Sequence, residues 1–139
     1  MKRIINSWWM LLPAAALGFF FYMSFFNAAY DHPGKSVYVN RCASCHGDQG
    51  EGIQKLVPPI ASSDYLAANF GQLPCIVRNG INGTMVVNQV TYNQPMYPIV
   101  ISDVEMANLM NYMSSELLHQ EYITTAEQVA QTLSQCKVP

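Results

Sequence analysis

Two cysteines separated by two residues, with a histidine directly after the second, stand at Cys42, Cys45 and His46. This spacing is typical of the covalent attachment site of a c-type haem. The two sulfurs can reach the two vinyl groups on one porphyrin edge, while the following imidazole binds the iron. The motif therefore predicts one covalently bound haem c, with His46 as an iron ligand.

The same Cys-x-x-Cys spacing also occurs in zinc sites and in thioredoxin-like redox pairs. A zinc ribbon needs a second Cys or His pair nearby, whereas the other cysteines, Cys75 and Cys136, stand alone and far from the motif. A thioredoxin-type motif belongs to a βαβ pattern, which the flanking sequence does not show. Haem attachment is the interpretation that fits the surrounding sequence.

The start of the chain differs in composition from the rest. No charged residue occurs from Ile4 to Tyr30, and this run exceeds the roughly 20 apolar residues that cross a bilayer. The alternative is a cleaved signal peptide, whose apolar region is usually shorter and ends in a small-x-small cleavage site. Because this run ends in Phe26-Asn27-Ala28-Ala29, we favour a retained N-terminal transmembrane helix over residues 1–30.

Charge predicts where the remaining residues lie. Lys2 and Arg3 precede the run, so the positive-inside rule keeps the N-terminus cytoplasmic and places residues 31–139 on the periplasmic side of a bacterial inner membrane. That part has five Lys or Arg against nine Asp or Glu, a formal charge of −4. An acidic surface argues against nucleic acid as a partner, and it favours either a partner with a basic patch or simple solubility.

Local signals predict helices on both sides of irregular loops. Pro33 suits the first position of a helix capped by Asp31, which would lead into the cysteine motif. Shorter helices are expected from Ser63 and through Cys75 to a C-terminal cap at Gly80. Residues 85–92 alternate weakly, as in a small hairpin.

Two helices are expected at the end of the chain. Ser102 and Glu105 fit a capping box, and Thr124 with Glu127 repeats that signature. Apolar residues behind the first box share one helical stripe. These residues are Met106, Leu109, Met110, Met113 and Leu117. The elements together predict an all-α domain with a C-terminal helical extension.

The cysteine motif is followed by Gly47, by a Pro-Pro-Ile segment that begins at Pro58, and by Asn93-Gln94-Pro95-Met96 just before a capped helix. With these parts in this order, residues 34–115 resemble the class I c-type cytochromes. The resemblance implies a small helical fold around one haem, with His46 and Met96 as axial ligands. It also implies that the carbonyl of Pro58 accepts a hydrogen bond from Nδ1 of His46. Gly34 and Tyr38 match the family's first helix, which packs on the penultimate helix through an aromatic that corresponds to Tyr112.

The sequence departs from the family at the distal ligand. Family members often have Met-Pro there, whereas this chain has Met96-Tyr97-Pro98. Met85 is the rival sixth ligand, because it too lies in irregular chain after the motif. His32 and His119 offer a bis-histidine alternative, but we expect both on the surface.

Cys75 and Cys136 remain once the haem motif is assigned. In an oxidising compartment, leftover cysteines tend to pair, so we predict a disulfide that ties the last helix to the middle of the domain. Two buried free thiols are the alternative.

Two strong protein ligands leave the iron no position for a substrate, so the resemblance implies an electron-transfer protein and not an enzyme. We expect a membrane-tethered carrier between a quinol-oxidising complex and an oxidase, reductase or photosynthetic reaction centre, or a permanent subunit of such a complex. The alternative is a haem enzyme or gas sensor with an open or displaceable sixth position. Against it, no distal acid/base set accompanies the motif.

Overall fold

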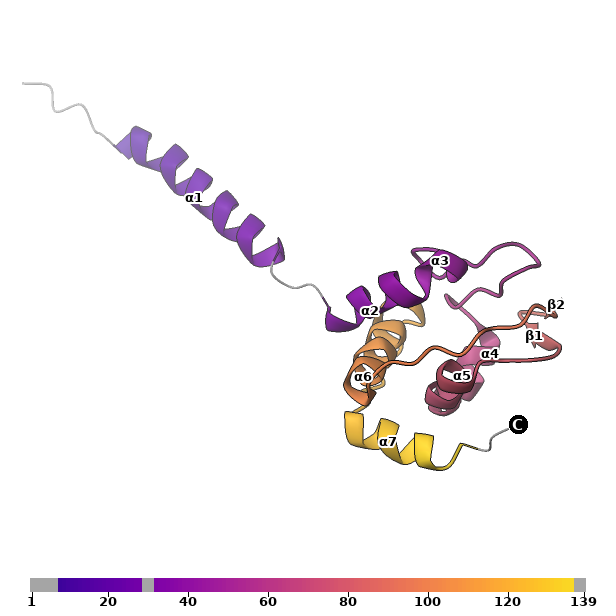
Figure 1. Ribbon diagram of the computed structural model, residues 1–139. Helices are drawn as coiled ribbons and strands as arrows, with labels where there is room; N and C mark the ends of the chain where they lie inside the picture. The colour runs from indigo at the N-terminus through magenta and orange to yellow at the C-terminus, as the bar shows by residue number, and fades with distance from the viewer. Residues whose placement is uncertain (1–7, 29–31, 137–139) are drawn as a thin grey trace, which may run out of the picture. The chain divides into compact units, whose positions relative to one another are not determined.

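The computed structural model describes residues 8–28 and 32–136, and the chain divides into two units, Met1–Asp31 and His32–Pro139 (Figure 1). Helix α1 (Trp8–Ala28) belongs to the first unit. Within the described residues, no helix combines the length and the apolar character that a membrane span requires. The predicted transmembrane helix therefore stays a prediction.

The cysteine motif lies on two consecutive helices. Helix α2 (Pro33–Arg41) begins at Pro33, as expected, but its N-cap is His32, whose Nδ1 accepts a hydrogen bond from the Gly34 amide at 3.2 Å. The predicted cap at Asp31, which lies outside the described residues, is therefore wrong by one residue. Cys42 caps the end of α2 and the start of the one-turn helix α3 (Ala43–His46), which carries Cys45 and His46.

The middle of the domain is built from short elements. Helix α4 (Asp64–Asn69) begins after its cap Ser63, η1 (Phe70–Gln72) is a 3₁₀ turn, and α5 (Leu73–Asn79) ends at Gly80. The predicted hairpin is present as strands β1 (Met85–Val87) and β2 (Val90–Tyr92), paired antiparallel. The second unit is thus mostly helical, as predicted, with the one small hairpin that residues 85–92 indicated.

Two helices close the chain. Helix α6 (Asp103–Tyr112) has the predicted capping box of Ser102 and Glu105, and it continues into a π-helical turn, η2 (Met113–Leu117). Helix α7 (Ala126–Ser134) is capped by Thr125 with Gln128, one residue beyond the expected Thr124 and Glu127 pair. All five residues of the predicted stripe on α6 and η2 are buried.

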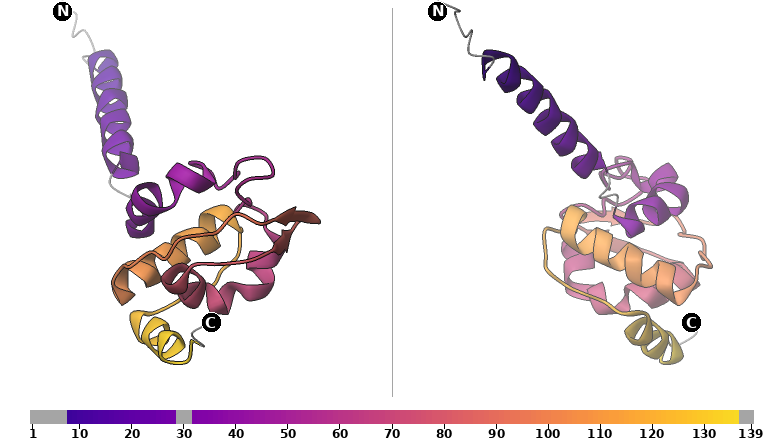
Figure 2. Two further views of the ribbon diagram at one scale, coloured as in Figure 1. Left: turned by 45° about the vertical axis from the view of Figure 1, so that its right-hand side comes forward. Right: turned by 90° about the vertical axis from the view of Figure 1, so that its left-hand side faces the viewer.

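Helix α6 lies between α2 and α7 and contacts both (Figures 1 and 2). A Cβ atom on Gly34 would overlap the backbone of Asn108, so the absence of a side chain lets α2 approach α6 closely. The rings of Tyr38 and Tyr112 lie 5.5 Å apart at this crossing, as the resemblance implied. Tyr38 is fully buried, and its hydroxyl donates to the Gly47 carbonyl at 2.7 Å, which fixes the loop after the motif.

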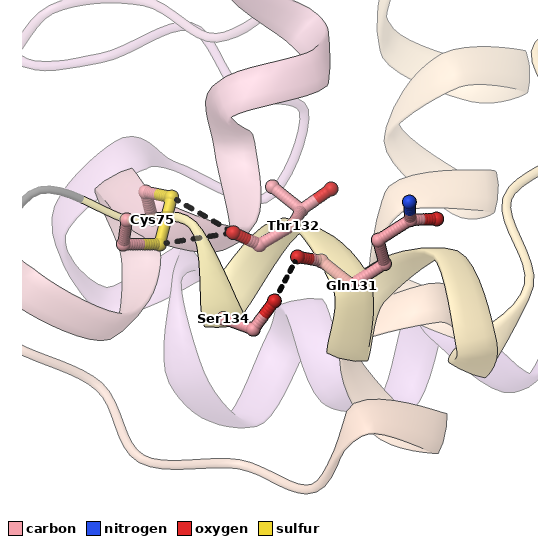
Figure 3. Close-up of a disulfide and its surroundings, with 5 residues drawn as sticks. Cys75, Gln131, Thr132 and Ser134 are labelled. Carbon is pink, nitrogen blue, oxygen red and sulfur yellow. Dashed lines mark hydrogen bonds between the residues drawn. A yellow bond between two sulfur atoms is a disulfide. The ribbon is translucent and has the colours of Figure 1, made fainter.

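The predicted disulfide is confirmed. Cys75 on α5 is bonded to Cys136, just after α7, and their Cα atoms are 5.6 Å apart (Figure 3). The bond therefore joins two elements that are 61 residues apart in sequence.

Candidate haem site

A cavity of about 330 Å³ opens beside the cysteine motif. All five predicted site residues line it: Cys42, Cys45, His46, Pro58 and Met96. Most of the remaining wall is aliphatic, and it comes from the loops at residues 56–60 and 94–99 as well as from α4, α5, β1 and α6. Of the Lys, Arg, Asp and Glu residues that the structure describes, Arg41 alone lines the cavity. Such a wall suits a flat, apolar group better than a polar substrate.

The α3 turn brings the two cysteines of the motif together. The amides of Cys45 and His46 both donate to the Cys42 carbonyl, at 3.1 and 2.9 Å, so residues 42 and 45 lie on one side of the turn. Both thiols are free; Cys42 is buried and Cys45 is exposed. Burial raises the pKa of the Cys42 thiol to about 11.

Pro58 fixes the imidazole of His46. The Nδ1 atom of His46 lies 3.0 Å from the Pro58 carbonyl oxygen, so it carries the proton and donates, and Nε2 remains as the metal-binding nitrogen. Burial lowers the pKa of His46 from 6.5, and the bond to Pro58 opposes this effect, so the ring favours its neutral, ligating form. This is the arrangement that the resemblance implied.

A tight turn holds the Pro58 carbonyl in place. The Gly52 amide donates to the His46 carbonyl at 2.7 Å, and Ile53 pairs with Val57. Gly52 has a φ of 72°, and a Cβ atom there would meet the carbonyl of Val57 and the backbone of Pro58. A side chain at this position would therefore displace the carbonyl that orients His46.

Met96 reaches the cavity from a segment paired with the end of α5. Its amide and carbonyl both bond to Ile81, each at 2.9 Å, and its side chain packs against the hydrophobic core. Gly80 has a φ of 73°, and a Cβ atom there would overlap the Met96 carbonyl. Met85 on β1 lines the same cavity, so a position in the cavity wall does not decide whether Met85 or Met96 is the sixth ligand.

The structure adds a residue that the sequence did not single out. Arg78, in the last turn of α5, donates to the Ile101 carbonyl at 2.9 Å and lies 3.6 Å from the carboxylate of Asp103. Its position just before the capping Gly80 is the only signal in the sequence. The carbonyl it binds belongs to a residue 23 positions away, which no local pattern indicates.

Neither alternative histidine lines the cavity. His32 caps α2 and its ring lies 5.6 Å from that of Tyr112, while His119 is exposed. The structure therefore gives no support to a bis-histidine site.

Comparison with known families decides what the cavity holds. The family model for cytochrome c matches residues 32–116, which include the motif, the cavity and α6. This chain belongs to the cytochrome c family. Two cytochrome c-552 sequences of Thermus thermophilus are each 30% identical to it over 87 residues, which is 59% of this chain. The cytochrome c subunit of a quinone-dependent alcohol dehydrogenase from Gluconobacter oxydans is 27% identical over 82 residues.

The matches cover less than two thirds of each relative: 66% and 58% of the Thermus proteins and 17% of the Gluconobacter subunit. The cytochrome c family carries haem c, an iron porphyrin bound covalently to the chain. The residues present fit this group, because two thiols, an imidazole held at Nδ1 and a thioether meet at one aliphatic cavity.

Proposed function

We propose that this protein is a membrane-tethered monohaem electron carrier in which His46 and Met96 are the axial ligands of the iron. The observation that carries the proposal is that Cys42, Cys45, His46 and Met96 line one cavity. Held by both His46 and Met96, the iron would exchange electrons and would have no place for a substrate.

The bound haem supplies reversible one-electron chemistry. The chain does the rest. Cys42 and Cys45 attach the group, and the Pro58 carbonyl orients His46 and makes it a better electron donor to the metal. The aliphatic wall excludes water and lowers the local dielectric, and a thioether ligand favours the reduced state. The aliphatic wall and the thioether would both favour a high reduction potential for the haem, whereas the stronger electron donation from His46 would lower it.

Partner classes follow from the relatives and the charges. The Gluconobacter relative is by name a subunit of a quinone-dependent dehydrogenase, which supports a place for this chain next to quinone-linked redox enzymes. We therefore propose a quinol-oxidising complex as donor and an oxidase, reductase or reaction centre as acceptor, with the chain either free or as a permanent subunit. Residues 31–139 carry a formal charge of −4, which supports a partner with a basic patch, and such a contact would weaken as the salt concentration rises.

Location follows from the first 30 residues. The run without charge from Ile4 to Tyr30 supports a membrane anchor, and Lys2 and Arg3 support a cytoplasmic N-terminus. The haem domain would then lie on the periplasmic side of a bacterial inner membrane.

Replacing each candidate methionine tests the ligand assignment. In the Met96→Ala variant, the ferrous iron should bind CO and the reduction potential should fall, because a thioether ligand is lost. Met85→Ala is the matched control, since Met85 lines the same cavity; it should bind no CO and keep its potential. If the Met85 variant alone binds CO, Met85 is the ligand. If the wild-type protein already binds CO, the site is open and the electron-carrier proposal fails in favour of a haem enzyme or gas sensor.

A further inference from the structure

The segment that carries Met96 is held by α5 and the residues just after it. Besides the paired bonds between Met96 and Ile81, the Ile99 amide donates to the carbonyl of Val77 at 2.9 Å. Arg78 adds its bond to the Ile101 carbonyl. Residues 96–101 therefore take their position from α5, and any movement of α5 would move Met96.

Helix α5 is too short to hold its own position. It has seven residues, and isolated helices of this length are unstable in water. Its stability comes from packing by Leu73, Pro74 and Val77, which are buried, and from the covalent bond at Cys75. The cross-link is thus one of the contacts that fix α5, from which the Met96 segment takes its position.

The other end of the cross-link is well anchored. Helix α7 contacts α5 and α6, and its residue Val129 is fully buried in the core. The sulfurs of Cys75 and Cys136 both lie close to the Thr132 carbonyl oxygen of α7, at 3.8 and 3.6 Å (Figure 3). The disulfide therefore ties α5 to a helix that is itself packed on the longest helix of the domain.

We infer that α7 and the Cys75–Cys136 disulfide hold α5, and through it the Met96 segment, in the position that keeps Met96 on the iron. The inference rests on the proposed function, because it takes Met96 as the sixth ligand. Neither cysteine lines the cavity, so both are positioning residues. Removing the bond takes away the covalent link from α5 to the anchored α7 and lets α5 open more often, which would release Met96 at each opening.

The test compares the full-length holoprotein with a Cys75→Ser, Cys136→Ser double variant. One readout is hydrogen exchange at the amides of Met96, Ile81 and Ile99, which reports opening of the segment directly. The other is the rate at which cyanide binds the ferric protein, which reports release of the sixth ligand. Both rates should rise about tenfold or more in the double variant.

The control variant must lower the stability of the domain through a residue that is not part of α5. Leu117→Ala serves, because Leu117 is buried and its contacts include the loop at Gly50 and Ser62. If both rates stay at the wild-type level in the double variant, or rise as much in the Leu117 variant, the inference is overturned and the disulfide is only a general stabiliser. If the double variant does not accumulate, the ferrous wild-type protein is compared before and after its disulfide is reduced by a phosphine, with CO in place of cyanide.

One further outcome separates this inference from the proposed function. If amide exchange quickens while ligand binding does not, Met96→Ala decides between two readings. A Met96 variant that binds cyanide or CO readily shows that the loosened segment still retains its ligand, which overturns the positioning role. A Met96 variant that binds neither shows that Met96 is not the ligand, so the ligand assignment fails. The faster amide exchange would still show that the disulfide holds residues 96–101 in position.

Discussion

At the residue scale, the site depends on a few positions where backbone atoms orient the residues that would bind the iron. The Pro58 carbonyl orients His46, and Gly52 and Gly80 each leave room for a carbonyl beside an iron-ligand candidate. Gly34 has the same role in the core, where it admits the backbone of α6. At such positions a methyl group matters because the atoms it would meet belong to backbone and cannot rotate away.

Gly34→Ala measures this effect. In a helix, alanine is favoured over glycine by about 1 kcal/mol, but the added Cβ would overlap the Asn108 carbonyl, and overpacking costs about 1 to 3 kcal/mol or more. We expect the steric cost to dominate and the free energy of unfolding to fall by about 2 kcal/mol. Denaturant unfolding of the holoprotein gives this value.

Gly71→Ala is the matched control, because a Cβ atom there has no neighbour within 4 Å. Its free energy of unfolding should stay within about 0.5 kcal/mol of wild type. Equal losses in the two variants would show that close approach of α2 to α6 is not what Gly34 provides.

At the element scale, helix starts were readable from sequence to within one residue. Gly80 ends α5 and Ser102 caps α6 as predicted, and α4 begins after Ser63, where its start was expected. The caps of α2 and α7 differ from the predicted ones by one residue, and in each case the neighbouring residue is also able to cap. Which of two neighbours becomes the cap is decided by the backbone dihedrals that tertiary packing imposes.

Only part of the candidate site could be predicted from motif spacing. Cys42, Cys45 and His46 are adjacent in sequence, so their chemistry could be read from spacing alone. Met96 could not, because the chain has eight methionines and only the fold selects those that reach the cavity. The bond from Arg78 to the Ile101 carbonyl was also out of reach, because a backbone acceptor leaves no mark in the sequence.

The capping box of α6 gives this element a pH dependence. The Ser102 hydroxyl and, next, the Ser102 amide hold the pKa of Glu105 below 4.5, its ordinary value. A carboxylate whose pKa is lowered by folding stabilises the fold at pH values above its unfolded pKa, and this contribution is lost as the pH falls through the folded pKa. Urea midpoints should therefore fall between about pH 5 and pH 3, and fall less in Glu105→Gln. Glu121→Gln, at an exposed carboxylate outside any helix, should follow wild type; an identical pH profile for all three proteins would contradict the role of the box.

At the scale of the whole molecule, the chain divides into two units, Met1–Asp31 and His32–Pro139. In the haem domain, the disulfide links α5 to the end of the chain and restricts movement near the candidate haem site. The N-terminal unit has the composition of an anchor. A tether would keep the carrier near membrane-bound partners and raise its effective concentration there.

The anchor is tested on the protein from native membranes. Carbonate washing should leave it in the pellet, and N-terminal sequencing should find residues 1–30 still present, because the run without charge lacks a convincing cleavage site. A chain that begins at Asp31 behind a cleavable signal should be soluble and still carry haem. A mature protein that starts near Ala29 would show instead that the segment is a signal peptide and the product a diffusible carrier.

The central claim is that His46 and Met96 together complete the coordination of one covalently bound haem. The near-infrared absorption spectrum of the ferric wild-type protein tests it most directly, because a bond from methionine sulfur to ferric iron gives a charge-transfer band in this region. We predict that the band is present, is retained in Met85→Ala and is lost in Met96→Ala. A high-spin ferric spectrum without the band, in the wild-type protein, would contradict the claim.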